Sequence, residues 1–242
     1  MKKILIYAAP FSYGPTGKAL SLASHLKDFY QVELAGYNTS YELMQLDKDI
    51  PIINLDSKTP EQLANRTLLN YDLIISCSDL KLASRANQLG VKSIMLDSLF
   101  WWQAPSCDEI LSTDAYVVQD FIGVREAISL LPQKCPNLHK LGAVLRKDLE
   151  KLKDQHEREE HILINYGGLE FPYVKVPRDS RYPFILTELL SYLFKELSGF
   201  KFTVTGNSQA MNILEKEYSD HKNVELKPCN MMILLSVLLR AN

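Results

Sequence analysis

The sequence predicts an α/β protein with two Rossmann-like domains, each built on its own parallel sheet. Two stretches, starting at Lys3 and at His161, share one pattern, in which an apolar strand leads into glycines and then into a helix. A buried parallel strand of this kind presents backbone N–H groups and a helix N-terminus to an anionic ligand. Two such starts predict two domains that face each other across a cleft, as in an enzyme acting on a diphosphate-activated substrate.

Strand and helix patterns alternate through the first domain, which we expect to span residues 1–147. Such alternation predicts a doubly wound parallel sheet, and a sheet of this type binds ligands beyond the carboxyl ends of its strands. The expected strands are 3–8, 32–36, 52–55, 73–76, 93–96, 116–119 and 138–142, and the expected helices are 17–29, 60–69, 80–89 and 124–131.

A second domain is expected at 161–242, after a charged linker at 148–160. Three strands are few for a free-standing parallel sheet, so we expect this domain to be incomplete. Its expected strands are 161–165, 201–205 and 224–226, and its expected helices are 184–197 and 209–218.

The last apolar stretch, Met231 to Leu239, contains one polar residue, Ser236. Full burial of a Leu, Ile, Val or Met side chain is worth on the order of 1.5–3 kcal/mol, so exposure of the whole stretch would be costly. Apolar patches of this size mark interaction surfaces. We therefore expect self-association, or a partner chain, through this stretch.

The composition excludes several classes of protein. The 242 residues are 46% hydrophobic and 23% charged, with a net charge of −2 and no basic stripe, so we expect no nucleic-acid partner. The four cysteines lie far apart without a C-x-x-C pair, and no histidines stand at metal-ligand spacing, so we expect neither a metal site nor a disulfide framework. No stretch reaches about 20 apolar residues, so we expect no membrane span and a cytoplasmic protein. Peripheral contact with a membrane stays open.

The first glycine loop differs from a P-loop, because Ser12 and Ala19 stand where that pattern needs glycine and Ser or Thr. We expect its small residues and single cation to hold an acceptor molecule or a phosphate at a helix N-terminus. The alternative is a turn in which glycine serves backbone geometry alone. The residues of this candidate acceptor site are Gly14, Thr16, Gly17 and Lys18.

Two aspartates follow predicted strands at the edge where a ligand is expected. Asp97 is our first candidate for a general base that deprotonates an acceptor hydroxyl, and Asp120 is the second. Either could instead cap the helix that follows. Trp101 and Trp102 could stack on a sugar or another planar acceptor, or they could pack in the core.

Several segments together resemble the GT-B glycosyltransferases, especially the branch of the lipid-linked GlcNAc transferase of peptidoglycan synthesis and the antibiotic and UDP-glucuronosyl transferases. Segment 14–18 is similar to the family's G-x-x-G-H loop, with Lys18 in place of histidine, and 141–146 is similar to the end of its first domain. Three further segments are similar to successive strand ends of its donor-binding domain: 162–168, 204–207 and 223–228. The resemblance covers essentially the whole chain.

The resemblance implies transfer of a sugar from a nucleotide diphosphate sugar to an acceptor hydroxyl, with no other cofactor and no strict need for a metal. It implies that the acceptor binds residues 1–145 and that Gly167 and Gly168 let the backbone approach the donor diphosphate, with Gly206 and Asn207 at the next strand end. The alternative for the glycine pair is a tight turn.

Arg178 and Arg181 lie in the loop after the glycine pair and could bind a phosphate with two hydrogen bonds each, or they could only solvate the loop.

Two departures from the family pattern leave other functions open. Lys18 cannot act as a base in the way histidine does unless burial lowers its pKa greatly. In the family, a glycine-rich segment and an acidic residue that grip the nucleotide follow the counterpart of 231–239, where this chain ends. The alternatives are a non-catalytic or split-enzyme subunit, which binds an acceptor or a partner, and a sugar-nucleotide epimerase.

Overall fold

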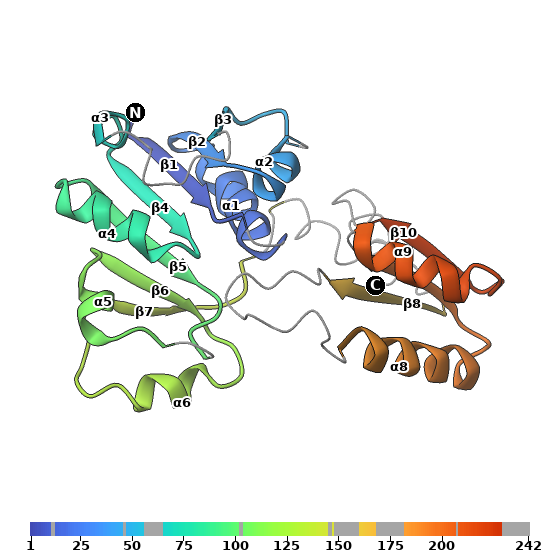
Figure 1. Cartoon of the computed structure of the whole chain (residues 1–242). Helices are drawn as coiled ribbons and strands as arrows, with labels where there is room; N and C mark the ends of the chain where they lie inside the picture. Colours follow the sequence, from blue (N-terminus) through green and yellow to red (C-terminus); the bar gives the residue numbers. More distant parts are fainter. Residues whose placement is uncertain are drawn as a thin grey trace. The chain divides into compact units, whose positions relative to one another are not determined.

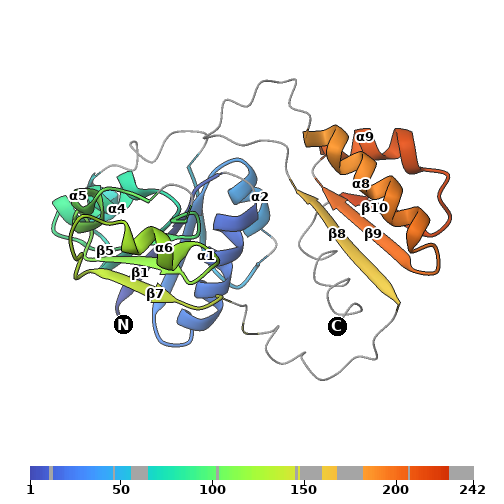
Figure 2. The ribbon, with the colours of Figure 1, turned by 90° about the horizontal axis from the view of Figure 1, so that it is seen from below.

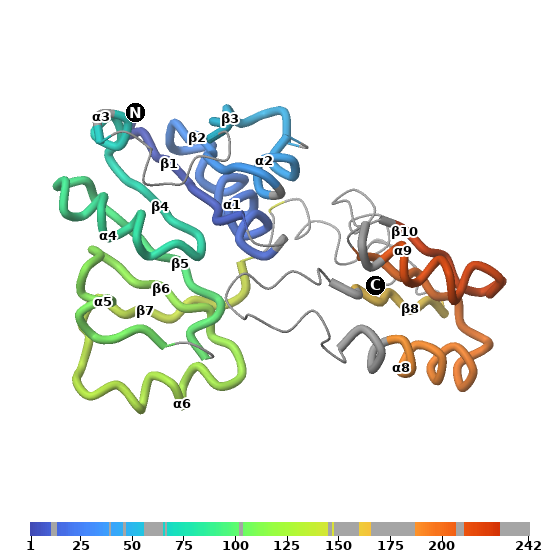
Figure 3. The backbone as a smooth tube through the Cα atoms, in the orientation of Figure 1, coloured from blue at the N-terminus to red at the C-terminus, as the bar shows by residue number. Residues whose placement is uncertain are grey.

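The computed structural model describes residues 1–10, 13–45, 47–55, 65–101, 104–144, 147, 160–167, 182–206 and 208–228. The chain divides into two compact units, Met1–Lys147 and Asp148–Asn242 (Figures 1 and 3). Each unit contains a parallel β-sheet and α-helices. The predicted α/β class with two Rossmann-like domains is confirmed.

Seven strands form the sheet of the first unit, in the order β3-β2-β1-β4-β5-β6-β7 (Figure 1). Every neighbouring pair is parallel. The strands are β1 (Lys3–Ala8), β2 (Gln31–Gly36), β3 (Ile52–Asn54), β4 (Leu73–Cys77), β5 (Lys92–Asp97), β6 (Ala115–Gln119) and β7 (Leu138–Leu141).

Helices cover both faces of this sheet. Leu5 and Tyr7 of β1 pack with Leu68 and Leu82 in one core cluster, which places two helices on that face. Side chains alternate along a strand, so the buried Ile6 points to the other face, where the first two helices pack. The helices of this unit are α1 (Tyr13–Leu26), α2 (Thr39–Met44), α3 (Asn65–Leu68), α4 (Leu80–Gln88), α5 (Cys107–Leu111) and α6 (Val124–Ser129).

Polar side chains fix the starts of α4 and α5. The side chain of Asp79 accepts a hydrogen bond from the backbone N–H of Leu82, at 3.1 Å. Ser106 and Glu109 form a capping box at α5, in which each side chain accepts a hydrogen bond from a backbone N–H of the other residue. These caps satisfy N–H groups that the helices leave unpaired.

In the described residues of the second unit, three strands form a parallel sheet in the order β10-β9-β8. Both of its described helices pack on one face, where Phe194 lies between Phe202 and Tyr218 with ring centroids 4.8 and 5.1 Å away (Figure 2). The elements are β8 (His161–Gly167), α8 (Tyr182–Glu196), β9 (Lys201–Gly206), α9 (Ser208–Tyr218) and β10 (Val224–Pro228).

The structure corrects the predicted glycine loop. Helix α1 begins at Tyr13 rather than at Gly17, so Gly14 and Gly17 lie inside the helix. Glycine commonly indicates a turn, but Pro15 is favourable in the first turn of a helix, and here the helix forms despite the glycines.

The sequence does not predict α2 and α5, because helices of six and five residues are too short to show a periodicity. The linker 148–160, except Glu160, and the stretch 231–239 lie outside the described residues.

Asp114 joins three elements at the amino edge of the first sheet. Its carboxylate accepts hydrogen bonds from Nζ of Lys92 at 2.7 Å, from the backbone N–H of Ser93 at 2.9 Å and from Nδ2 of Asn87 at 2.9 Å. Desolvation raises the pKa of Asp114, but these donors outweigh it and hold that pKa below its ordinary value.

A depressed pKa in the folded protein contributes stability above the unfolded pKa, and this stability is lost as the pH falls through the folded pKa. We therefore expect Asp114→Asn to lower the free energy of unfolding by about 1 kcal/mol at neutral pH, measured by urea denaturation. The difference should shrink below about pH 4, where aspartate is protonated in the unfolded chain. A difference that is constant with pH would contradict a role for the charge of Asp114.

Candidate functional site

The carboxyl edge of the first sheet has its topological switch point between β1 and β4. From β1 the chain continues outward through β2 to β3 on one side, whereas β4 begins the series that runs outward on the other side. The ends of neighbouring strands are held in register, because Ala9 donates its N–H to the carbonyl of Cys77 and Ser78 donates its N–H to the carbonyl of Leu96, both at 3.1 Å. Doubly wound sheets bind ligands at such a point.

Lys18 extends from α1 to this edge. Its Nζ donates hydrogen bonds to Oγ of Ser78 at 3.1 Å and to Oγ of Ser98 at 2.8 Å. The residue is only 6% exposed, and no described carboxylate forms an ion pair with it. One buried amine therefore ties the helix to the residues that follow β4 and β5.

Burial lowers the pKa of Lys18, and Cys77 and Asp97 oppose this shift without overcoming it. The thiol of Cys77 is itself buried, and desolvation raises its pKa to about 12, so it stays neutral beside the amine. The protein thus desolvates the ammonium form of Lys18 without fully compensating its charge. Such a group attracts an anionic or strongly polar atom of a ligand.

Ser78, whose hydroxyl accepts a hydrogen bond from Lys18, has a rare backbone conformation. Its φ of 68° lies in the left-handed region, which costs a non-glycine residue on the order of 1–3 kcal/mol. Backbone strain of this kind persists where neighbouring interactions impose it and is common at functional sites. The strain supports a functional role for this turn.

Asp97, the first candidate base, is buried at the end of β5 with 7% exposure. One carboxylate oxygen accepts the N–H of Leu99 at 2.7 Å and the other accepts the hydroxyl of Tyr116 at 2.8 Å. Burial, followed by the charge of Asp97 and this hydrogen bond, raises the pKa of Tyr116, so the tyrosine keeps its proton and remains a donor. The two donors fix the orientation of the Asp97 carboxylate.

The predicted acceptor residues on α1 lie beside Lys18. Gly14 and Lys18 are one turn apart on the same helix face, with Gly17 next to them. A Cβ atom placed on either glycine would meet no described atom within 4 Å. Thr16 is fully buried, and its Oγ1 has no hydrogen-bond partner among the described residues. The first turns of α1 therefore leave open space at Gly14 and Gly17, while the unpaired hydroxyl of Thr16 is buried.

Asp120 and Trp101 lie away from this cluster. The carboxylate of Asp120 forms ion pairs with Arg125 at 3.4 Å and with Lys140 at 3.9 Å at the surface. Trp101 is half exposed and lies against Gly123, whose φ is 87° and where an added Cβ would lie 3.3 Å from Cβ of Trp101. Trp102 lies outside the described residues.

The carboxyl edge of the second sheet carries part of the predicted donor site. Gly167 of β8 pairs with Gly206 of β9, and α9 begins two residues later at Ser208. The Oγ1 atom of the buried Thr205 has no hydrogen-bond partner among the described residues. The other predicted donor residues lie outside the described residues: Gly168, Arg178, Arg181 and Asn207.

Sequence reasoning missed Ser78, Ser98, Tyr116 and Thr205. Ser78 and Ser98 stand one residue beyond β4 and β5, so their place at strand ends was a usable signal. Nothing in the sequence indicates that Tyr116 reaches across to Asp97.

Within the described part of the chain, no group of three or more His, Cys, Asp or Glu side chains could hold a metal ion. In the same residues, no helix has the length and apolar character that crossing a membrane requires.

No protein-family model and no curated protein matches this chain, but solved structures do. S. aureus MnaA, solved with UDP, is 11% identical with a TM-score of 0.66, and the match covers 100% of this chain and 73% of that one. A candidate UDP-N-acetylglucosamine 2-epimerase from Listeria monocytogenes is 12% identical with a TM-score of 0.60, covering 99% and 72%. The E. coli heptosyltransferase WaaC, solved with ADP, is 12% identical with a TM-score of 0.52, covering 98% and 78%.

At these identities the similarity establishes the fold alone. The matched proteins include a heptosyltransferase and a candidate 2-epimerase. The chain therefore has a fold of the GT-B type, as the resemblance in the sequence implies.

Proposed function

We propose that the protein is a glycosyltransferase, which moves a sugar from a nucleotide diphosphate sugar to an acceptor hydroxyl. The observation that carries this proposal is the buried arrangement of Lys18 and Asp97 at the switch point of the first sheet. Two side chains of opposite charge, each more than nine-tenths buried, are expensive to keep at one sheet edge unless they act on a ligand. The matches to proteins solved with UDP and ADP support a nucleotide-linked donor.

In this proposal Asp97 is the general base. The acceptor oxygen forms a bond to the anomeric carbon of the donor while the bond from that carbon to the diphosphate oxygen breaks, and the hydroxyl proton passes to Asp97. Each carboxylate oxygen has a further lone pair besides the one that accepts from Leu99 or Tyr116. The carboxylate is therefore oriented but still able to accept a proton.

Lys18 would position the acceptor. Nζ of Lys18 has three donor positions, of which Ser78 and Ser98 take two, so one remains for an acceptor oxygen. The open space at Gly14 and Gly17 would admit the acceptor backbone or ring.

The donor diphosphate would bind at the carboxyl edge of the second sheet, at Gly167, Gly168, Gly206 and Asn207. Backbone N–H groups there and the N-terminus of α9 would stabilise the charge of the departing diphosphate. Arg178 and Arg181 would bind its phosphates.

A sugar-nucleotide epimerase is the second candidate, because the cluster contains more proton-carrying groups than transfer requires. Lys18, Asp97 and Tyr116 come from three different elements and interact electrostatically in one buried cluster. Epimerisation by proton transfer needs both an acid and a base beside one carbon. The match to a candidate 2-epimerase also supports this alternative.

Calorimetry with UDP-, ADP- and dTDP-sugars, followed by NMR in D₂O, separates the candidates. A glycosyltransferase should bind one of these donors with a micromolar dissociation constant and release nucleoside diphosphate only when an acceptor is added. Deuterium that enters the sugar ring would instead support the epimerase. No binding at millimolar concentration would overturn both and support a non-catalytic or split-enzyme subunit.

We expect Asp97→Asn to lower kcat by about 100-fold or more, since removal of a general base typically costs that much. The dissociation constant of the donor should change little, because Asp97 is proposed to contact the acceptor. Asp120→Asn is the matched control, because Asp120 lies at the next strand end in a surface ion-pair network. If steady-state kinetics showed a larger loss of kcat for Asp120→Asn than for Asp97→Asn, Asp120 would be the base instead.

We expect Lys18→Met to abolish acceptor binding. The free energy of unfolding should stay within about 1 kcal/mol of that of the parent protein at neutral pH, because removal of a desolvated charge offsets the loss of two hydrogen bonds. Burial depresses the pKa of Lys18, so the unfolded chain binds more protons and the stability of the parent rises with pH relative to the variant. Urea unfolding between pH 7 and pH 10 tests this. A large loss of stability that is constant with pH would make Lys18 purely structural.

A further inference from the structure

We propose that Cys107 and Cys135 form a thiol pair that reacts with small disulfide molecules and closes a reversible disulfide bond. The pair lies where β6 and β7 begin, at the amino edge of the first sheet. The candidate functional site lies at the carboxyl edge, so this inference does not depend on the proposed function.

The two thiols converge on one carbonyl group. Sγ of Cys107, in the first turn of α5, donates to the carbonyl oxygen of Gln133 at 3.7 Å, and Sγ of Cys135 donates to the same oxygen at 3.8 Å. The two thiols also interact electrostatically. Both cysteines are free thiols in this structure. Two segments that are distant in the sequence thus bring their sulfur atoms together.

The backbone around the pair is anchored independently of the sulfur atoms. Nδ2 of Asn137 donates to the carbonyl of Ile110 at 2.7 Å and to the carbonyl of Thr113 at 2.8 Å. Tyr116 donates its N–H to the carbonyl of Asn137 at 2.8 Å. A disulfide would therefore join segments that other hydrogen bonds already hold together, which limits the rearrangement it needs.

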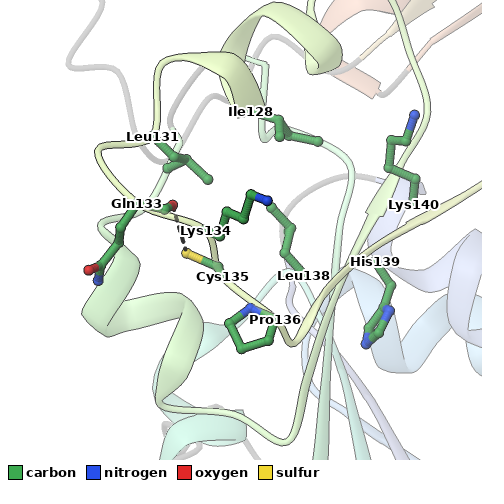
Figure 4. Close-up of a pocket in the computed structure, with 9 residues that line it drawn as sticks. All are labelled: Ile128, Leu131, Gln133, Lys134, Cys135, Pro136, Leu138, His139 and Lys140. Carbon is green, nitrogen blue, oxygen red and sulfur yellow. Dashed lines mark hydrogen bonds between the residues drawn. The ribbon is translucent and has the colours of Figure 1, made fainter.

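Only one of the two thiols is accessible. Cys135 lines a cavity of about 800 Å³, which is of the size that holds a small organic molecule (Figure 4). Cys107 is buried, with 5% exposure. The lining combines apolar side chains with basic ones, a chemistry that fits a small disulfide bearing carboxylates. The other lining residues are Ile128, Leu131, Gln133, Lys134, Pro136, Leu138, His139 and Lys140.

This difference in access sets the order of the steps. The thiolate of Cys135 attacks one sulfur of a small disulfide such as glutathione disulfide, forming a mixed disulfide and releasing one small thiol. The thiolate of Cys107 then attacks Sγ of Cys135, which forms the Cys107–Cys135 bond and releases the second small thiol. The two protein thiols lose two protons and two electrons, and the small disulfide takes up both.

The pair should rest in its reduced form until such an oxidant is present. Desolvation, followed by the interactions with the neighbouring Cys107 thiol, raises the pKa of Cys135 to about 11. The thiolate is the reactive species, so the neutral thiol that predominates at physiological pH reacts slowly.

Cys77 provides an internal control. It is fully buried at the end of β4, where desolvation raises its pKa to about 12. It should therefore remain unmodified under conditions that oxidise the pair. Cys229 lies outside the described residues, so Cys229→Ser should be present in the parent protein and in every variant.

The test is incubation of the full chain with glutathione disulfide at mildly alkaline pH, followed by mass spectrometry of the intact protein and its peptides. We expect the parent to become lighter by two hydrogen atoms, with the peptides of Cys107 and Cys135 joined and separated again by dithiothreitol. Cys107→Ser should stop at one glutathione attached to Cys135. Cys135→Ser should stay unmodified, because Cys107 is buried. Circular dichroism establishes that each variant is folded.

Two results would overturn the proposal. In the first, glutathione remains on Cys135 of the parent, which means that Cys107 does not reach the mixed disulfide. In the second, Cys107 reacts in the Cys135→Ser variant as fast as Cys135 reacts in the Cys107→Ser variant, which removes the difference in access. Cys107→Ala repeats the trapping step if Cys107→Ser does not fold.

Discussion

The parallel direction of the seven strands is the constraint on which the first unit depends. Because every neighbouring pair is parallel, all carboxyl ends lie on one edge and all amino ends on the other. Crossovers through α1 and α4 then return the chain across the sheet, so residues distant in sequence meet at strand ends. Lys18, Ser78 and Ser98 meet in this way at the carboxyl edge, and Cys107 and Cys135 meet at the amino edge.

The Lys18 cluster and the thiol pair differ in what their burial costs. A buried lysine whose Nζ is hydrogen-bonded to two serines and forms no ion pair within the described residues is a poor arrangement for stability alone, because the attraction of Asp97 does not overcome the desolvation of the ammonium group. The thiol pair carries no such penalty, since both cysteines are free thiols, which behave as small apolar groups. The first arrangement therefore supports the proposed ligand site, whereas the second would have a function only in the presence of an oxidant.

Much of the fold could be predicted from the sequence, but little of the site could. The apolar runs that form β1 and β4 show their burial directly, because both faces of a central parallel strand are covered. The predicted start of α1 was wrong, because glycines near a proline are typical of a turn. In the structure these glycines lie in the first turns of the helix. Asp97 could be found because it ends a strand, whereas its bond to Tyr116 depends on which strands are neighbours.

The burial of Lys18 changes how its place in the sequence should be interpreted. In the resembling family a histidine often stands at this position, and an exposed lysine there could not replace it as a base. The structure buries Lys18 and lowers its pKa, which narrows the chemical difference between the amine and an imidazole without removing it. In the proposed mechanism the proton passes instead to Asp97, whose carboxylate is oriented by two donors. In the proposed site the base on β5 and the cation on α1 would belong to two different elements. With the base on β5, the cation on α1 would not need to be a histidine.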